Sequence, residues 1–226
     1  MIAIDGPSGS GKSSVSLAVA RSLGVGYLDT GAMYRAVTWW CLDQRVELDD
    51  AGAVAQAARE VPLEMGTDPS APTVSVSGRD IGAAIRTTEI SSVVSVVATN
   101  LDVRAELRRR QRELMAQIAE RTGGVVAEGR DITTVVAPDA DVRILLTASE
   151  EARLRRRSAE LHGEVSAETI EATRDQVVRR DRDDSTVSTF HEAADGVILV
   201  DTSDLDFEQS VQAVLDVVAT ATAGRE

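Results

Sequence analysis

The sequence predicts an α/β fold in which one five-stranded parallel sheet is flanked by helices. Short apolar runs alternate with longer segments whose apolar residues recur at helical spacing, which is typical of parallel sheets covered by helices. A glycine-rich stretch follows the first apolar run directly, and turn-forming residues interrupt the chain between residues 60 and 95. The pattern therefore indicates a layered core with a small inserted segment.

Five apolar runs are predicted as the strands of the sheet: residues 2–4, 27–29, 125–127, 142–146 and 197–200. The helices are predicted over about 15–23, 31–42, 102–121, from about 150, 167–181 and 207–218. Val15, Val19 and Leu23 recur at the spacing of one helix face, and Gly24 stands at the position of a C-cap. Thr30 is predicted to cap the second helix.

The alternation of apolar runs and helical patterns is interrupted between residues 60 and 95. The segments 61–65, 73–77 and 82–86 are short, and glycine, aspartate and prolines separate the first two, as in a hairpin. We expect residues 60–95 to form an inserted subdomain, and residues 1–59 and 96–226 to form the core.

The composition of the 226 residues bounds the class of protein. An apolar content of 43% is enough to bury a core. The formal net charge is −13, and an acidic surface of this kind disfavours general binding to nucleic acid. No window of 18 apolar residues occurs, and no leader pattern precedes the glycine-rich stretch, so no membrane span is expected. The single cysteine, Cys41, fits a reduced cytoplasm, and we expect a monomer.

A phosphate-binding motif, GPSGSGKS, occupies residues 6–13 between the first predicted strand and the following helix. Such a loop turns backbone N–H groups and a helix N-terminus toward a polyphosphate, and its lysine adds a point charge. The expected nucleotide-binding residues are Gly6, Pro7, Ser8, Gly9, Ser10, Gly11, Lys12, Ser13 and Ser14. Ser13 is the expected Mg²⁺ ligand.

Lys12 is the only lysine in the chain, which excludes the guanine-reading N-K-x-D element of GTPases. Arginines instead concentrate in two clusters: Arg104, Arg108, Arg109, Arg110 and Arg112, and then Arg153, Arg155, Arg156 and Arg157. They either serve a phosphate site or lie on solvated helix faces, paired as Glu106 with Arg110 and Glu151 with Arg155.

Four ordered segments resemble the bacterial cytidylate kinases, which are P-loop nucleoside monophosphate kinases. The segments are IDGPSGSGKS at 4–13, DTGAMYR at 29–35, GRD at 129–131 and RDRDDST at 180–186, and they span nearly the whole chain. The resemblance implies a P-loop kinase core, an inserted subdomain that binds the nucleoside monophosphate, and an arginine-rich lid over about residues 153–190.

The resemblance also implies the reaction ATP + CMP ⇌ ADP + CDP, with dCMP as a further acceptor. An ionised phosphate oxygen is the nucleophile, so no general base is needed, and the protein supplies position and positive charge. The implied catalytic residues are Lys12, Arg130, Arg156 and Arg180. The implied acceptor-binding residues are Thr30, Arg35, Ser95, Arg104, Arg130, Asp131, Arg180 and Asp184.

Asp131 and Arg104, with Ser95, are expected to read cytosine, because a carboxylate accepts from N4 while a guanidinium donates to the ring acceptors. Asp131 alternatively is a plain turn carboxylate, and Thr30 only a helix cap. Glu128 is expected to hold Mg²⁺ through water, or to be a solvated carboxylate.

One departure from the family pattern concerns the last motif. The family usually continues Arg-Asp-x-x-Asp-Ser-x-Arg, whereas Val187 stands here in place of the second arginine. Either the segment is two residues shorter or the side chain is replaced, and both cases affect one expected phosphate contact. Arg182 or a lid arginine is expected to substitute, and a reduced turnover is also expected. Two other functions fit the phosphate loop: a kinase for UMP or a small metabolite, and a nucleotide-binding switch without transfer activity.

Overall fold

The computed structural model describes residues 1–163, 165–188 and 190–223, without the side chains of residues 160–162, 175–176, 178–180 and 184. In this part of the chain five strands form a parallel sheet in the order β2-β6-β1-β7-β8. The strands are β1 (Ile2–Asp5), β2 (Gly26–Asp29), β6 (Val125–Gly129), β7 (Val142–Thr147) and β8 (Ile198–Asp201). The predicted α/β fold is confirmed, and each predicted run overlaps one of these strands.

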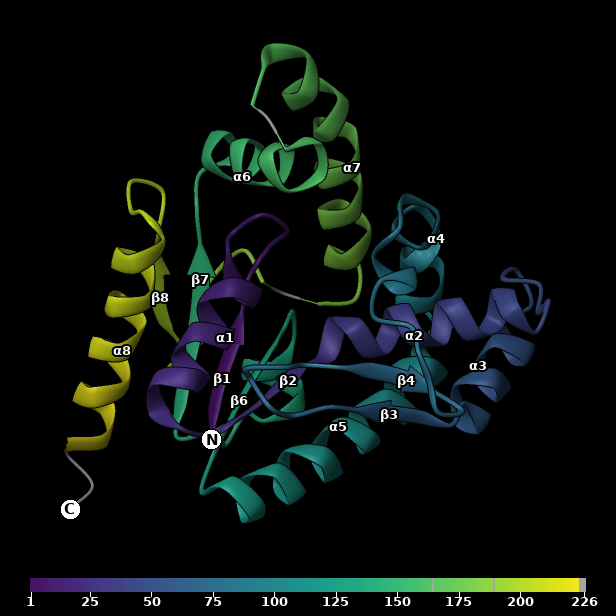
Figure 1. Ribbon diagram of the computed structural model, residues 1–226, viewed down its shortest axis with the longest axis horizontal. Helices are drawn as coiled ribbons and strands as arrows, with labels where there is room; N and C mark the ends of the chain where they lie inside the picture. Colours follow the sequence, from purple (N-terminus) through teal and green to yellow (C-terminus); the bar gives the residue numbers. More distant parts are fainter. Residues whose placement is uncertain (164, 189, 224–226) are drawn as a thin grey trace.

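Helices cover both faces of the sheet (Figure 1). They are α1 (Lys12–Leu23), α2 (Thr30–Asp43), α5 (Leu101–Thr122) and α8 (Phe207–Ala223). On the face of α1 and α8, Ile4 packs in a buried cluster with Val214, and on the other face Ala3 packs in a cluster with Leu107. Ala3 and Ile4 are neighbours in β1, so their side chains point to opposite faces and anchor the two layers.

A small antiparallel sheet lies beside the main one, in the order β3-β4-β5. Its elements and neighbours are α3 (Ala51–Glu60), β3 (Leu63–Met65), β4 (Val74–Val76), β5 (Arg79–Asp80), the 3-10 turn η1 (Ala84–Arg86) and α4 (Thr88–Ala98). The predicted hairpin is confirmed, because β3 and β4 pair antiparallel. The loop of this hairpin contacts the core, where Tyr27 N–H donates to the Thr67 carbonyl at 3.0 Å and Arg21 Nε to the Pro69 carbonyl at 2.7 Å.

Two helices, α6 (Glu150–His162) and α7 (Ala167–Ser185), pack together beyond the carboxyl end of β7 (Figure 1). Both were predicted, but α7 runs past residue 181, so the first residues of the expected polar segment 183–189 are helical. A π-helical turn, η2 (Ile132–Val136), follows β6. No helix in the described part of the chain combines the length and apolar character needed to cross a bilayer.

The helix ends test two predictions. Gly24 closes α1 with a φ of 66°, in the left-handed region, so the predicted C-cap is confirmed. The predicted N-cap of α2 is wrong. Asp29, not Thr30, caps this helix, since its carboxylate accepts the N–H of Ala32 at 2.8 Å. The Thr30 hydroxyl is engaged elsewhere, donating to the backbone carbonyl of Glu128 at 2.7 Å.

Candidate active site

A cavity of about 710 Å³ lies where the carboxyl ends of β2 and β6 meet the loop after β1. Helices α2, α4, α5 and α6 and the small antiparallel sheet also contribute to its walls. Parallel strands collect the residues that follow them at one edge, which is why ligand sites form there in open α/β sheets. Segments far apart in the sequence are thus brought to one cavity.

The loop after β1 forms one wall of the cavity. The residues of the loop that line it are Pro7, Ser8, Gly9, Gly11, Lys12, Ser13 and Ser14, whereas Gly6 and Ser10 do not. Gly9 and Gly11 have φ angles of 77° and 86°, which only glycine adopts at little cost. At Gly9 a Cβ atom would also come within 2.6 Å of the carbonyl oxygen of Arg153. The glycines of the motif therefore set both the curl of the loop and its packing against α6.

Glu128, at the end of β6, connects the loop to the sheet. Its Oε1 accepts the Ser13 hydroxyl at 2.6 Å and the Tyr27 hydroxyl at 3.2 Å, and its Oε2 lies 3.4 Å from Lys12 Nζ. The side chain is buried, so the alternative of a solvated carboxylate is wrong. Asp29 stands opposite Glu128 in the strand register, and burial together with this neighbouring carboxylate raises the pKa of Asp29 to about 6.

Asp131 and Arg104 form a buried ion pair in the cavity wall. Arg104 donates to Asp131 Oδ2 at 2.6 Å and to the carbonyl of Ala98 at 3.1 Å, and its guanidinium lies 5.9 Å from the Tyr34 ring centroid. Burial raises the pKa of Asp131, although Arg104 opposes this shift. Asp131 lies in the turn after β6, is paired and is only 7% exposed, and its role in reading the base stays a prediction.

Arg35 and Arg130 converge on the same cavity. Arg35 donates to the Ile85 carbonyl and to the Ser91 hydroxyl, both at 2.9 Å. Burial lowers the pKa of Arg35 to about 10, and the nearby charge of Arg157 adds to this effect. Arg130 lies 3.4 Å from Asp181 and 4.8 Å from the ring centroid of Phe190. Several guanidinium groups therefore surround one space, as an anion site requires.

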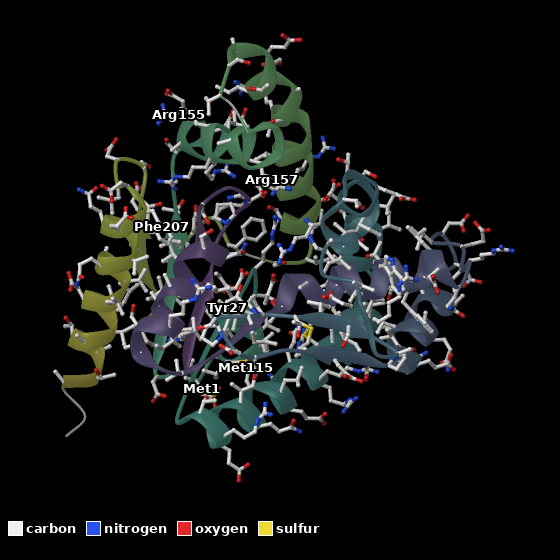
Figure 2. The ribbon with its side chains drawn as sticks, in the orientation of Figure 1. Met1, Tyr27, Met115, Arg155, Arg157 and Phe207 are labelled. Carbon is white, nitrogen blue, oxygen red and sulfur yellow. The ribbon has the colours of Figure 1, made fainter. Side chains whose placement is uncertain are left out.

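The two arginine clusters have mixed roles. On α5 only Arg104 lines the cavity among the five arginines of the first cluster, and Arg110 pairs with Glu106 at 2.7 Å as the surface alternative expected. On α6, Arg155 pairs with Glu151 at 2.6 Å, whereas Arg157 lines the cavity. Figure 2 shows Arg155 and Arg157 on opposite sides of this helix.

Arg156 does not line the cavity. Its guanidinium donates to the carbonyls of Ser10, Thr202 and Leu205 at 3.2, 2.6 and 3.1 Å, so in this structure it braces the back of the loop. Ser95 also lies outside the lining, half-buried on α4. The expected contacts of Arg156 and Ser95 with the nucleotides stay predictions.

The structure describes only some of the side chains of the last motif, residues 180–186. Arg180 and Asp184 lie on α7, but their side chains are outside the described residues. The side chain of Arg182 is 77% exposed, lies 3.9 Å from Asp183 and does not line the cavity. Asp29, Arg86 and Arg157 line the cavity although the sequence pattern assigned them no individual role. The sequence did point weakly to two of them: Arg157 follows Arg156 in the second arginine cluster, and Asp29 is the first residue of the DTGAMYR segment.

The position of the loop between β1 and α1 of a parallel sheet defines the P-loop class of nucleotide-binding proteins. Within this class, the sequence model of the family described as Cytidylate kinase matches residues 2–220. A cytidylate kinase of Streptomyces avermitilis is 48% identical over 226 residues, covering 100% of this chain and 95% of that protein. A cytidylate kinase of Cutibacterium acnes is 48% identical over 225 residues, covering 96% of this chain and 95% of that protein.

The chain belongs to the cytidylate kinase family. The predicted resemblance and the predicted enzyme class, a kinase, are thereby confirmed.

Proposed function

We propose that this protein transfers the γ-phosphoryl group of ATP to CMP, and also to dCMP, giving ADP and the cytidine diphosphate. One observation carries the proposal: the Arg104–Asp131 pair, with an N–O distance of 2.6 Å, lies in the wall of the cavity that the Lys12 loop also lines. A base-reading pair and a phosphate-binding loop thus face a common space. The curated relatives carry the name of the same activity.

The Arg104–Asp131 pair is proposed to distinguish cytosine from uracil. Cytosine presents an amino donor at N4 and acceptors at N3 and O2, whereas uracil presents O4 and N3–H. The Asp131 carboxylate accepts from N4, and Arg104 donates to the ring acceptors. Uracil would leave the buried Asp131 carboxylate facing a second acceptor, and an unpaired buried polar group is costly. The pair therefore favours CMP over UMP, against the rival of a UMP kinase.

On the donor side, the proposal assigns the triphosphate of ATP to the loop from Gly6 to Ser14. The backbone N–H groups, the N-terminus of α1 and the ammonium of Lys12 all supply positive charge. Lys12 Nζ lies 3.4 Å from the carboxylate of Glu128, and this ion pair restrains the lysine side chain beside the loop. The compact ammonium on its flexible side chain stays close to the phosphate oxygens and stabilises their negative charge while the phosphoryl group is transferred.

On the acceptor side, Arg35, Arg130 and Arg180 are assigned to the CMP phosphate, and Asp184 with Arg180 to the ribose hydroxyls. The convergence of Arg35 and Arg130 on the cavity supports the first assignment. We propose Arg157 as the substitute for the arginine that Val187 replaces, because among the described side chains of residues 153–190 it is the arginine that lines the cavity. Thr30 also lines the cavity and is assigned to the acceptor. Arg156 is proposed to act on the phosphates only indirectly, by bracing the loop.

The proposed phosphoryl transfer needs no general acid or general base from the protein. The attacking oxygen of CMP is already ionised, and transfer proceeds roughly in line through a transition state with charge spread over the moving phosphoryl oxygens. Guanidinium and ammonium groups stabilise that charge, and alignment of the two nucleotides supplies much of the rate. A binding switch would have no need for arginines at a second phosphate, which favours the enzyme.

The oxygen groups beside the loop fit Mg²⁺, which prefers hydroxyl, carboxylate and phosphate oxygens. We propose the Ser13 hydroxyl as a direct ligand and Glu128 as a ligand through water; these two groups already meet at 2.6 Å. Mg²⁺ when bound neutralises charge on the donor phosphates.

We further propose that residues 60–95 form the acceptor-binding subdomain and residues 153–190 the lid. The contacts of Arg35 with Ile85 and Ser91 support the first assignment, because they join α2 of the core to the inserted segment. The lid would exclude water, which otherwise competes with CMP for the phosphoryl group. A reduced cytoplasm and a monomeric state are retained as proposals, the first because Cys41 is buried and unpaired.

A coupled assay of ADP formation tests the function. The purified protein is given MgATP and, in separate reactions, CMP, dCMP, UMP, AMP and GMP. We expect turnover with CMP and dCMP to exceed turnover with UMP by at least about 100-fold in kcat/KM. Equal turnover of CMP and UMP would contradict the proposed specificity and favour the alternative of a kinase that uses UMP. Binding of ATP without turnover of any acceptor would instead support the switch.

A further inference from the structure

A buried carboxylate on α7, Asp181, is shared by three parts of the site. Its Oδ1 accepts the backbone N–H of Ser8 at 3.1 Å and lies 3.4 Å from a guanidinium nitrogen of Arg130. Its Oδ2 accepts a hydrogen bond from Arg153 and forms an ion pair with it. Only 5% of the residue is exposed. One side chain thus connects the phosphate-binding loop, α6 and the turn after β6.

The electrostatics of this cluster depend on Asp181. The side chains of Arg130 and Arg153 are 13% and 12% exposed, so their mutual repulsion is weakly screened. The carboxylate between them turns two like charges into a cluster with a net charge of +1. Loss of that carboxylate would leave the repulsion between the two guanidinium groups uncompensated and would remove an ion pair of Arg130, which lines the cavity.

A second contact fixes Arg130. The guanidinium lies 4.8 Å from the ring centroid of Phe190, whose side chain is fully buried. The carboxylate of Asp181 and the Phe190 ring therefore both restrain one arginine. Phe190 belongs to the segment in which this chain departs from the expected arginine pattern.

Asp181 also acts on the donor loop. Arg153 donates to the carbonyl of Ser8 at 3.0 Å, while Asp181 accepts the N–H of the same residue. Both polar groups of this peptide position are engaged by the Asp181–Arg153 pair, which fixes the start of the loop before a nucleotide enters. A change at Asp181 is therefore transmitted to the donor loop and to Arg130 together.

We propose that Asp181 is a positioning residue for phosphoryl transfer: it orients Arg130 toward the acceptor phosphate and couples that arginine to the donor loop through Ser8. The inference rests on the proposed function, since it names a further residue of the same site. A residue that aligns charge for the transition state affects kcat more than ground-state binding. Asp181 therefore sets the rate of transfer rather than the affinity for either nucleotide.

The substitution Asp181→Asn tests the proposal, since asparagine keeps the size and an acceptor for Ser8 but loses the charge. Asp183→Asn is the matched control on the same helix; it removes an equal charge from a side chain that is 36% exposed. We expect kcat of Asp181→Asn to fall at least about 30-fold, with KM for ATP changed less than about twofold. A kcat equal to that of the control, or a loss confined to KM, would overturn the proposal.

A double variant separates positioning from general damage to the fold. If repulsion between Arg130 and Arg153 causes the loss, Arg153→Gln in the Asp181→Asn background should restore kcat at least about fivefold. Additive or larger losses in the double variant would contradict the proposed role. The acceptor for all variants is the monophosphate that the wild type turns over fastest. UMP turnover by the wild type thus refutes the proposed specificity alone, whereas a wild type without any transfer overturns both proposals.

Discussion

Asp5 holds Thr133 through two hydrogen bonds: its Oδ2 accepts the backbone N–H of Thr133 at 2.8 Å and the Thr133 hydroxyl at 2.6 Å. Its Oδ1 accepts the N–H of Ile132 at 2.9 Å. Asp5 ends β1, and Asp131 directly precedes the anchored residues, so the end of one strand fixes, at the end of its neighbour, the carboxylate that we propose reads the base. Burial raises the pKa of Asp5 to about 6, even though these hydrogen bonds favour the ionised form.

This raised pKa predicts a pH dependence of stability. The folded state binds the Asp5 proton more tightly than the unfolded chain, whose carboxyl has the ordinary pKa of 3.8. The stabilisation is complete below that value and is lost as pH rises through about 6. We therefore expect the free energy of unfolding of the wild type, relative to Asp5→Asn, to decrease by up to about 3 kcal/mol between pH 4 and pH 7. Urea titrations of both proteins across this range measure the difference, and an increase with pH would contradict the assignment.

Lys12→Met should nearly abolish transfer. The variant keeps an unbranched side chain of similar length but loses the ammonium that we propose faces the donor phosphates, so kcat should fall at least about 100-fold. Arg121→Met, at the exposed end of α5, removes a positive charge away from the cavity and should change kcat less than about twofold. Steady-state assays with saturating MgATP and CMP compare the two. A near-normal kcat for Lys12→Met would remove the lysine from the mechanism.

Asp131→Asn should change the choice of base. The amide that replaces the carboxylate can donate to O4 of uracil, so the ratio of kcat/KM for CMP to that for UMP should fall at least about 100-fold. KM for ATP should stay within about twofold, because Asp131 is assigned to the acceptor and not to ATP. Asp139→Asn is the exposed control of equal charge change. An unaltered CMP/UMP ratio in Asp131→Asn would refute the base-reading role.

The core sheet was predictable because each of its strands is a short apolar run next to a helical pattern. Helices α3 and α4 were not predicted, for different reasons. In α3 half of the ten residues are alanines, so the segment has few large apolar side chains that would mark a helix face, and the stretch precedes the turn residues that dominate the region. In α4 several valines and serines favour other structures when considered alone, and the helix forms where Ile90 and Val97 are buried against the core. Tertiary burial decided both.

Sequence motifs singled out Lys12 and Asp131, and both residues line the cavity. The contacts of Asp181 were not predictable, because its three partners come from the loop after β1, the turn after β6 and the first turns of α6. Only packing brings these segments together. The choice between Arg156 and Arg157 likewise depends on which face of α6 meets the cavity, and one residue of rotation reverses the answer.

That choice gives the last prediction. Arg157→Gln removes a guanidinium whose charge already acts on Arg35 in the cavity, so KM for CMP should rise at least about tenfold and kcat should fall. Arg155→Gln is matched in helix, in residue type and in charge change, but its side chain is 49% exposed and paired with Glu151. Because exposed pairs of this kind contribute little, Arg155→Gln should leave both constants within about twofold. Initial rates over a range of CMP concentrations distinguish the two variants. Equal behaviour of Arg155→Gln and Arg157→Gln would show that α6 does not supply the missing arginine.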